Sequence, residues 1–322
     1  MSGQALKMLI TSAGRRAGLV ECFRASAARM DVALEIHACD LYPELSAACA
    51  LADARFVAPR CTDTAYIPTL LDYARDNDIA LIVPTIDTEL QPLAAARADF
   101  AALGTYVHVS SEEVIDIVRD KKRTMDVLAE AGVPVPRTAT LEQFRQDHEG
   151  WVWPLFIKPV AGSASRGIAL LHDISELKSE YPEPMLVQEA LGGDEYTVNL
   201  FVDEEGVMQA AIPHFRMSVR AGEVEKGRTV RRADFETIAR DLAAALPGPR
   251  GVLCFQLFDD PRLGPRIIEI NARFGGGYPL ADRAGGHFAE NVLRTAIGLP
   301  LVACDDWQDG LTMLRYDNAV FV

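Results

Sequence analysis

Residues 251–277 have the sequence GVLCFQLFDDPRLGPRIIEINARFGGG, which has the pattern of two strands joined by a turn. The first predicted strand, Val252–Phe258, is apolar enough to be buried. The segment Asp259–Pro265 contains two prolines and a glycine, a composition that favours a turn. The second predicted strand is Arg266–Ala272. The stretch therefore predicts a strand–turn–strand unit in a sheet with one buried side.

Polar side chains alternate with apolar ones along the second strand. Because side chains of a strand point to opposite faces in turn, Glu269, Asn271 and Arg273 are expected on one face. Ile268 and Ile270 are expected on the other face, in the core. A polar group buried without a partner costs about 2–7 kcal/mol, and a charge costs more. The polar row therefore needs partners.

A hard cation and a phosphate group together satisfy this row. Magnesium prefers oxygen ligands, which Glu269, Asn271 and, from the neighbouring strand, Gln256 supply. Arg273 suits phosphate oxygens or a developing negative charge. Gly275–Gly277 allow the backbone to approach a ligand closely. The alternative is an edge strand with a solvated polar face, followed by an ordinary glycine-rich turn.

Composition limits the classes of partner. The 322 residues suffice for two or three domains, and the 49% hydrophobic content is typical of a globular protein. The formal net charge of −14 argues against nucleic acid or an anionic membrane as the main partner. The sequence contains no apolar run long enough for a membrane span and no secretory pattern at its start. Its six cysteines include no C-x-x-C pair, so we expect reduced core cysteines in a cytoplasmic protein.

The N-terminal region has the pattern of a doubly wound parallel α/β domain. A strand at Leu6–Ile10 is followed by a small-residue turn, Thr11–Gly18, and a helix to about residue 28. The turn has G-x-x-x-G spacing rather than G-x-G-x-x-G, which disfavours a dinucleotide site and a nicotinamide-dependent oxidoreductase. Arg15 and Arg16 in this turn are candidate contacts for a carboxylate or phosphate.

A second turn, Pro84–Glu89, follows the strand predicted at Ile79–Val83. It lies at the carboxyl end of that strand, where open α/β sheets bind ligands. Asp87 and Glu89 are candidates for contacting a substrate amine. Alternatively, they are acidic residues that the dipole of the following helix favours.

A lysine interrupts the apolar strand predicted at Trp153–Pro159. A glycine- and serine-rich loop, Val160–Gly167, and a further strand, Ile168–Leu171, come next. A flexible loop with free backbone N–H groups and an adjacent Lys158 is typical of a lid over phosphates. An ordinary hairpin loop leaves the buried lysine unexplained. The Lys121–Arg123 run is either a solvated helix face or a second phosphate contact.

The remaining pattern predicts mainly an antiparallel sheet. The helices and strands expected after the glycine-rich loop are a helix at Asp173–Tyr181, strands at Met185–Leu191, Tyr196–Val202, Val207–Ile212 and Phe215–Val219, and helices at Ala233–Leu246, Tyr278–Ala284 and His287–Ile297. Glu225–Arg228 has a loop-like composition. Arg216, Arg220 and Arg228 are candidates for binding a substrate carboxylate.

Three stretches together resemble the ATP-grasp superfamily. They are FIKP at 156–159 with its glycine loop, VQEALGGDEYTV at 187–198, and the FQ and EINARFGGG segments that end at Gly277. Their order and separation match the family. The chain is most similar to the carboxyphosphate-forming halves of the carbamoyl-phosphate synthase large subunit and to smaller related ligases. It lacks the paired halves and the allosteric domain, so the resemblance implies a single-unit ligase.

The resemblance implies a role for each matching residue. Lys121 and Lys158 correspond to the lysines on the nucleotide phosphates, and Arg273 to the arginine that stabilises an acyl phosphate. Glu195 corresponds to the carboxylate on the ribose hydroxyls. The implied loop, hinge and metal residues are Gly162, Ser163, Ser165 and Gly167, then Gln188, Glu189 and Leu191, then Gln256, Glu269 and Asn271. The implied cofactors are ATP and Mg²⁺, with Mn²⁺ as an alternative.

The resulting fold expectation is an α/β and α+β chain in three parts. An N-terminal α/β domain at 1–118 precedes an ATP-grasp small lobe at 119–187, and the large lobe with the metal site and the C-terminal tail spans 188–322. The favoured hypothesis is an ADP-forming carboxylate–amine ligase that acts through an acyl phosphate on a small carboxylate such as an amino acid. Small-molecule substrates are the expected partners, and dimers are common in the family.

Two alternatives remain open. In one, bicarbonate is phosphorylated, as in carbamoyl-phosphate synthase. In the other, the chain binds ATP as a regulator without turnover. The intact set of Lys158, Glu269, Asn271 and Arg273 argues against the regulatory hypothesis.

Overall fold

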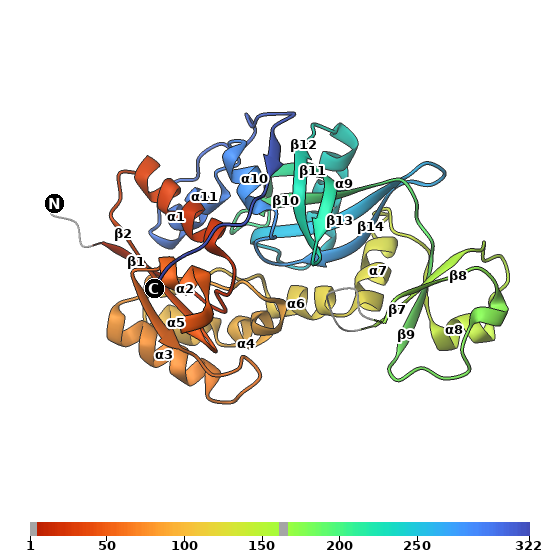
Figure 1. The fold of residues 1–322 in the computed structure, drawn as a ribbon, viewed down its shortest axis with the longest axis horizontal. Helices are drawn as coiled ribbons and strands as arrows, with labels where there is room; N and C mark the ends of the chain where they lie inside the picture. Colours follow the sequence, from red (N-terminus) through yellow and green to blue (C-terminus); the bar gives the residue numbers. More distant parts are fainter. Residues whose placement is uncertain (1–4, 161–166) are drawn as a thin grey trace.

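The computed structural model describes residues 5–160 and 167–322, which form three β-sheets with flanking helices. The N-terminal sheet lies at one end of the molecule and the smallest sheet at the other (Figure 1). The largest sheet lies between them, over the polypeptide that connects the two. This arrangement confirms the expected fold class, a parallel α/β sheet followed by antiparallel sheets.

The N-terminal sheet has five parallel strands in the order β3-β2-β1-β4-β5. The strands are β1 (Leu6–Ile10), β2 (Leu34–Asp40), β3 (Ala54–Val57), β4 (Leu81–Val83) and β5 (Tyr106–Val107). The helical segments are α1 (Ala17–Arg29), η1 (Pro43–Leu45), α2 (Ala47–Leu51), α3 (Tyr66–Asn77), η2 (Asp87–Glu89), α4 (Leu90–Ala95) and α5 (Arg97–Ala102). The strand order reverses direction at β1, so the turns after β1 and β4 lie side by side at the sheet's carboxyl edge.

A buried carboxylate joins these two turns. Glu89 has no exposed surface and accepts hydrogen bonds from Ser12 Oγ (2.7 Å), Tyr66 OH (2.6 Å) and the backbone N–H groups of Thr85 (2.6 Å) and Ile86 (3.1 Å). It is therefore a structural residue. Of the two roles left open for Glu89, the structure excludes contact with a substrate amine, because the carboxylate is enclosed by its own chain.

The smallest sheet is antiparallel, in the order β6-β9-β7-β8. Two helices lead into it, α6 (Glu112–Arg119) and α7 (Lys121–Glu130), and its strands and helices are β6 (Thr138–Thr140), α8 (Leu141–Gln146), β7 (Leu155–Pro159), β8 (Ala169–Leu171), η3 (Ile174–Glu176) and β9 (Met185–Glu189). A small core that includes Phe144, Ile157 and Val187 packs one side of this sheet against α8. The other side carries Lys158.

The largest sheet has six antiparallel strands in the order β14-β13-β10-β11-β12-β15. Its elements are β10 (Asp194–Val202), β11 (Met208–Arg220), β12 (Glu223–Thr229), α9 (Ala233–Ala245), β13 (Gly251–Asp260), β14 (Gly264–Asn271), α10 (Tyr278–Arg283), α11 (Phe288–Ala296) and β15 (Thr312–Leu314). Helix α9 packs against β10 and β11, and both α10 and α11 pack against α1 of the N-terminal unit. The C-terminal helices thus tie the largest sheet to the N-terminal unit.

Four sequence expectations differ from the structure. The helix expected at 173–181 is only the short η3, and the two strands expected at 207–219 are one bulged strand, β11. The loop expected at Glu225–Arg228 is the middle of β12, which pairs with β11 and β15. A register shift opposite Gln256 and Leu257 places Ile267, not Ile268, in the core next to Ile270.

The state of the cysteines and the lack of a membrane-spanning segment were also expected from the sequence. All six cysteines are free, five of them buried and Cys61 half-buried, as expected for core cysteines. Among the described residues, no helix is both long enough and apolar enough to cross a membrane.

Replacing Glu89 is expected to destabilise the protein strongly. The Glu89→Ala variant leaves the hydroxyl and backbone donors around the carboxylate without an acceptor, and each unsatisfied buried donor costs about 1–3 kcal/mol. The thermal unfolding midpoint should fall by several degrees. The matched control Glu113→Ala removes an exposed glutamate in the first turn of α6 and should change the midpoint little. Equal midpoints for the two variants would contradict the structural role of Glu89.

Candidate functional site

The strand register gathers polar side chains on one face of the six-stranded sheet. Gln256 on β13 lies opposite Glu269 on β14 and opposite Thr197 on β10. Cys254 lies opposite Asn271 in the same pairing. Because directly opposite residues in an antiparallel pair share a face, these side chains lie together. The intervening residues of β13, such as Phe255 and Leu257, belong to the hydrophobic core.

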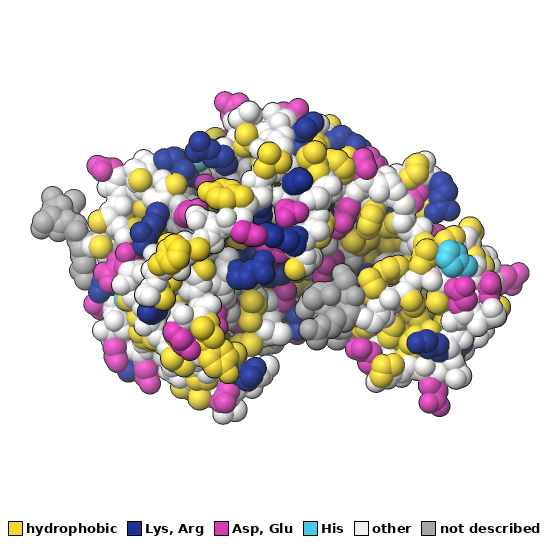
Figure 2. Space-filling view, viewed as in Figure 1, with side chains coloured by type: hydrophobic (Ala, Val, Ile, Leu, Met, Phe, Trp, Pro, Cys, Tyr) yellow, Lys and Arg dark blue, Asp and Glu magenta, His cyan; other side chains and the backbone are white. Residues whose placement is uncertain are grey.

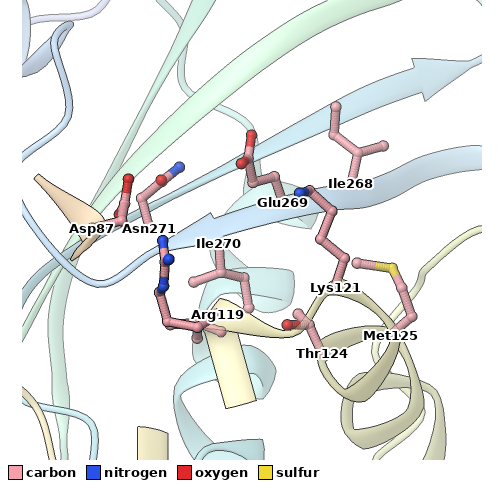
Figure 3. Close-up of a pocket in the computed structure, with 10 residues that line it drawn as sticks. Asp87, Arg119, Lys121, Thr124, Met125, Ile268, Glu269, Ile270 and Asn271 are labelled. Carbon is pink, nitrogen blue, oxygen red and sulfur yellow. The ribbon is translucent and has the colours of Figure 1, made fainter. Parts of the chain in front are cut away.

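A pocket on this face is bounded by three segments of the chain (Figure 3). Its lining residues come from η2, from the α6–α7 corner and from β14: Asp87, Val118, Arg119, Lys121, Thr124, Met125, Ile268, Glu269, Ile270 and Asn271. Lys121 extends its ammonium group toward Glu269, and Arg119 extends its guanidinium group toward Asn271 (Figure 3). The pocket therefore has both basic groups and oxygen donors in its wall.

Arg273 closes this region through an ion pair with the N-terminal unit. Its Nη2 donates to Asp87 Oδ2 at 2.7 Å and to Asn271 Oδ1 at 3.1 Å, and its Nη1 donates to the carbonyl of Phe274 at 3.1 Å. Burial is the largest single influence on the pKa of Arg273 and lowers it, but Asp87, Cys254 and Glu269 together outweigh burial and the net shift is upward. The guanidinium is therefore fixed in position and positively charged.

Lys158 reaches the same face from the smallest sheet. It is 7% exposed, and its Nζ lies 3.4 Å from the carbonyl oxygen of Ile268 on β14. Burial lowers the pKa of Lys158 to about 8, while the charge of Glu269 acts in the opposite direction and that of Lys121 adds to the lowering. Burial also lowers the pKa of Lys121. Two partly desolvated lysines thus converge near one glutamate, an arrangement that suits a multiply charged anion.

Glu195 and Arg216 form an ion pair on the neighbouring strands. Arg216 Nε lies 3.0 Å from Glu195 Oε1, and its Nη1 donates to Thr197 Oγ1 at 3.2 Å. Burial raises the pKa of Glu195, although Arg216 opposes the shift. Of the three arginines singled out in the sequence, Arg216 lies on the polar face. Arg220 binds Glu225 and Asp317, and Arg228 is exposed and donates to Thr312 Oγ1, so neither reaches this face.

Asp87 and Arg119 are site residues that the sequence did not assign. The sequence left open whether Asp87 contacts a substrate or interacts with the dipole of its helix. It gave no reason to single out Arg119, which directly precedes the Lys121–Arg123 run. Their position depends on the packing of η2 and α6 against β14, which connects segments far apart in the chain. A local signal for either role is absent from the sequence.

The sequence matches two protein families over most of its length. Residues 8–108 match the family described as "PylC-like, N-terminal domain", and residues 118–277 match the family described as "ATP-grasp domain". The chain is an ATP-grasp domain protein. This match confirms the expected superfamily of ligases.

Three individual proteins illustrate the similarity. The 3-methyl-D-ornithine–L-lysine ligase of Methanosarcina mazei is 29% identical over 171 residues, which cover 52% of this chain but only 42% of that protein. The biotin carboxylase domain of Hydrogenobacter thermophilus 2-oxoglutarate carboxylase superposes with a TM-score of 0.73 at 15% identity, over 96% of this chain and 74% of that one. The L-amino acid ligase from Bacillus licheniformis gives 0.66 at 16% identity, over 92% and 75%. Both superpositions show a shared fold.

The residues predicted to form the hinge, Gln188, Glu189 and Leu191, lie where the chain passes from the smallest sheet to the largest. Gln188 is buried and its Nε2 donates to Thr138 Oγ1 at 2.7 Å, while Glu189 Oε2 accepts from the backbone N–H of Arg137 at 2.8 Å. Leu191 is half-buried just beyond β9. The side chains of Gln188 and Glu189 are thus engaged in hydrogen bonds with Thr138 and Arg137. Any contact of this segment with a base must therefore come from its backbone or from Leu191.

The predicted lid loop of the ATP-grasp domain lies mostly outside the described residues. Gly162, Ser163 and Ser165 belong to this part. Gly167 is described and exposed, with a φ of +68° that favours glycine. A Cβ at this position would lie 3.1 Å from the Pro159 ring, next to Lys158 in β7.

The donor set of the ATP-grasp site fits magnesium with phosphates as additional ligands. Glu269 offers a carboxylate and Asn271 an amide oxygen on the same face of β14, which are oxygen ligands of the kind that magnesium prefers. The described residues contain no group of three or more His, Cys, Asp or Glu side chains able to hold a metal. With one carboxylate in the set, substrate phosphates and water would complete the coordination.

Gln256 fits this set less directly than the two residues on β14. Its amide lies between Arg216 Nη1 (3.2 Å) and Glu269 Oε2 (3.3 Å). Both neighbours are satisfied when the amide oxygen accepts from Arg216 and the amide nitrogen donates to Glu269. In that orientation the oxygen faces away from Glu269, so Gln256 acts as a metal ligand only after its amide rotates.

The turn after β14 needs glycine because three side chains press against it. A Cβ at Gly275 would lie 2.9 Å from Cys254 Sγ, at Gly276 2.5 Å from the Glu223 carboxyl carbon, and at Gly277 2.6 Å from His214 Nε2. The imidazole of His214 is fully buried, and burial lowers its pKa to about 3. His214 is therefore neutral at physiological pH.

The pKa of Lys158 predicts a pH dependence of nucleotide affinity. Phosphates are attracted by the charged lysine, so the affinity for a magnesium complex of a non-hydrolysable ATP analogue should fall as pH rises through about 8. The Lys158→Arg variant keeps its charge in this range and should lose less affinity. Isothermal titration calorimetry of both proteins between pH 7 and 9.5 tests this expectation. Parallel pH profiles would contradict it.

The same shift predicts an effect of opposite direction on stability. An ordinary lysine has a pKa of 10.5, so between about 8 and 10.5 the unfolded chain binds more protons than the folded one. The contribution of Lys158 to the free energy of unfolding should therefore rise with pH across this range. Replacing Lys158 with Met should flatten that rise in chemical denaturation. An unchanged slope would contradict the lowered pKa.

Proposed function

We propose that the protein is an ADP-forming ligase that uses Mg·ATP to join a carboxylate to an amine through an acyl phosphate. The observation that carries this proposal is the convergence on one polar face of Lys121, Lys158, Glu269, Asn271 and Arg273, of which Lys121, Glu269 and Asn271 line the pocket. They come from α7, β7 and the end of β14. Such a site neutralises and positions charged groups, which is the main requirement of phosphoryl transfer.

Each residue has a distinct part in this proposal. Lys158 and Lys121 bind phosphate oxygens of ATP, where they neutralise charge. Glu195 binds the ribose hydroxyls, with Arg216 holding its carboxylate in place. The backbone of Gln188–Leu191 binds the adenine, and the loop that includes Gly162, Ser163, Ser165 and Gly167 covers the phosphates. Leu191 packs near the base.

Arg273 stabilises the charge that develops on the transferred group. Its ion pair with Asp87 orients the guanidinium and leaves its remaining N–H groups for the substrate. Asp87 is in this scheme a positioning residue. Glu269 and Asn271, joined by Gln256 if its amide rotates, would hold one or two magnesium ions, and manganese is an alternative. The metal supplies neutralisation of the β- and γ-phosphate charge when bound.

The proposed reaction has two steps. A carboxylate oxygen of the first substrate attacks the γ-phosphorus, the bond to the bridging oxygen breaks, and ADP leaves. The amine nitrogen of the second substrate then attacks the acyl carbon, inorganic phosphate departs with the former carboxylate oxygen, and the nitrogen loses a proton. The products are an amide, ADP and phosphate.

Amino acids are the proposed substrate class. The relative from Methanosarcina mazei is named as a ligase of 3-methyl-D-ornithine and L-lysine, and the structural neighbour from Bacillus licheniformis is named as an L-amino acid ligase. This chain spans less than half the length of the curated relative, so the inference concerns the class of substrate rather than those two compounds. The proposal also includes the domain boundaries given above, at 118/119 and 187/188. It further includes a homodimeric state.

Bicarbonate phosphorylation is the second candidate function. It is favoured by the similarity in fold to the carboxylase domain from Hydrogenobacter thermophilus, whose structure is described with MgADP and bicarbonate. The carbamoyl-phosphate synthase-like pattern of the sequence agrees with it. A purely regulatory ATP-binding protein is less favoured, because the charged residues expected for turnover are all present around the pocket.

Release of ADP and phosphate from Mg·ATP should require a carboxylate and an amine together. The assay combines amino acids, other carboxylates and bicarbonate, each with and without amines. Activity should fall at least about 100-fold in Lys158→Ala and Glu269→Ala, since each variant removes a charge that contacts the phosphates or the metal. Chelation of divalent metal by EDTA should abolish turnover. Arg220→Ala, which removes a surface arginine, serves as the control with activity near wild type.

Other product patterns would redirect or refute the assignment. ADP release with bicarbonate alone would establish the second candidate instead. AMP and pyrophosphate as products would contradict the acyl-phosphate mechanism. Tight ATP binding without turnover on any pair would favour the regulatory hypothesis.

A further inference from the structure

A second charged cluster lies at the crevice where the strand order of the N-terminal sheet reverses. The turns after β1 and β4 meet there, and Thr85 Oγ1 donates to the carbonyl of Ser12 at 2.7 Å. Arg16 spans both turns, with its Nη2 3.4 Å from the carbonyl oxygen of Thr85. Open α/β sheets bind ligands at this position. The Glu89 network described above serves to hold the two turns together.

Glu223 on β12 is the centre of this cluster. Arg16 Nη1 lies 3.3 Å from one of its carboxylate oxygens, and Arg315 Nη1 lies 3.0 Å from the other. Burial alone would raise the pKa of Glu223, but Arg16, Arg315 and Arg15 together lower it. Two arginines thus pair with one carboxylate. In a chain with a formal net charge of −14, this local excess of positive charge favours the binding of an anion.

The cluster remains open to solvent on one side. The side chain of Glu223 is 37% exposed and that of Arg315 is 28% exposed, while that of Arg16 is 18% exposed. Figure 2 shows Lys and Arg side chains gathered beside Asp and Glu side chains near the middle of the visible face, between the N-terminal unit and the six-stranded sheet. A small charged molecule therefore has access to these groups.

The cluster also adjoins the proposed reaction centre. The guanidinium of Arg315 donates to the carbonyl of Gly276, three residues beyond Arg273. Burial lowers the pKa of Arg16, and the charges of Arg273 and Asp87 are among the further influences on it. The cluster thus adjoins the turn that follows Arg273.

We propose that Arg16, Glu223 and Arg315 bind the head group of an α-amino acid substrate, with its carboxylate on the two arginines and its ammonium on Glu223. The inference rests on the proposed function, whose substrate class it specifies, and the carboxylate held here is not the one that is phosphorylated beside Arg273. Guanidinium groups match the planar carboxylate, and the glutamate matches the ammonium. A phosphate monoester fits less well, because Glu223 would repel it.

The experiment measures binding without turnover, by calorimetry in the presence of magnesium and a non-hydrolysable ATP analogue. The ligands are the standard amino acids, and for each binder the analogue without its α-amino group and the analogue without its carboxylate. For L-lysine these are 6-aminohexanoate and cadaverine. The protein variants are Arg16→Gln, Arg315→Gln and Glu223→Gln. The matched controls are Arg220→Gln and Glu225→Gln, which alter a neighbouring exposed ion pair.

Variants and analogues should show matching losses. Arg16→Gln and Arg315→Gln should weaken amino-acid binding roughly 10- to 100-fold, as expected for hydrogen bonds between charged groups, yet leave binding of the decarboxylated analogue unchanged. Glu223→Gln should do the same for the amino acid and spare the analogue without the α-amino group. Both controls and the affinity for the nucleotide analogue should remain within about twofold of wild type, as for surface substitutions.

Two safeguards keep the test decisive. The Arg16→Lys variant retains the positive charge with little loss of packing, so it should bind the amino acid more tightly than Arg16→Gln does. This variant keeps the test valid if Arg16→Gln folds poorly. Equal losses for the amino acid and both analogues in every variant would overturn the head-group site, as would the absence of amino-acid binding by the wild type. Binding that follows the predicted pattern without any turnover would refute the ligase and retain the site. Turnover with an unaltered KM for the amino acid in the three variants would refute the head-group site and retain the ligase.

Discussion

The register of three antiparallel strands, β10, β13 and β14, determines which side chains form the site. Gln256 pairs with Glu269 on one side and with Thr197 on the other, so the polar residues of β14, β13 and β10 must share a face. The opposite face is occupied by core residues such as Phe255 and Leu257. A slip of one residue would exchange the two faces and bury the charges. Burial of the core face, against which α9 packs at β10 and β11, therefore favours the register that exposes the polar face.

The site is completed by groups that the large sheet does not contain. Lys158 comes from the smallest sheet, Lys121 from α7 and Asp87 from the N-terminal unit. Two electrostatic interactions connect these residues to the large sheet and the turn after it. One is the Asp87–Arg273 ion pair at 2.7 Å, and the other is the attraction between Lys158 and Glu269. Burial opposes the charged form of Lys158, and a phosphate would compensate it more fully than Glu269 alone. The electrostatics thus favour the anion-bound state, which suits a site for Mg·ATP.

The alternation of β14 and the family resemblance were sufficient to predict the fold class and the row of Glu269, Asn271 and Arg273. The predictions fail where the outcome depends on distant partners. The core position of Ile267 follows from a bulge opposite β13, which the local pattern RIIEIN does not encode. Residues 225–228 have the composition of a loop, but pairing with β11 and β15 makes them a strand. Similarly, Glu89 and Asp87 look alike in sequence, yet one is enclosed by hydroxyl and backbone donors and the other faces Arg273.

The central claim is that a substrate carboxylate is activated by phosphorylation at the polar face beside Arg273. The most direct measurement uses an amino-acid substrate with ¹⁸O in its carboxylate and follows the label by mass spectrometry during turnover with Mg·ATP. The account predicts that one ¹⁸O atom appears in inorganic phosphate for every amide formed. Unlabelled phosphate, with the second labelled oxygen found in AMP or in water, would contradict it.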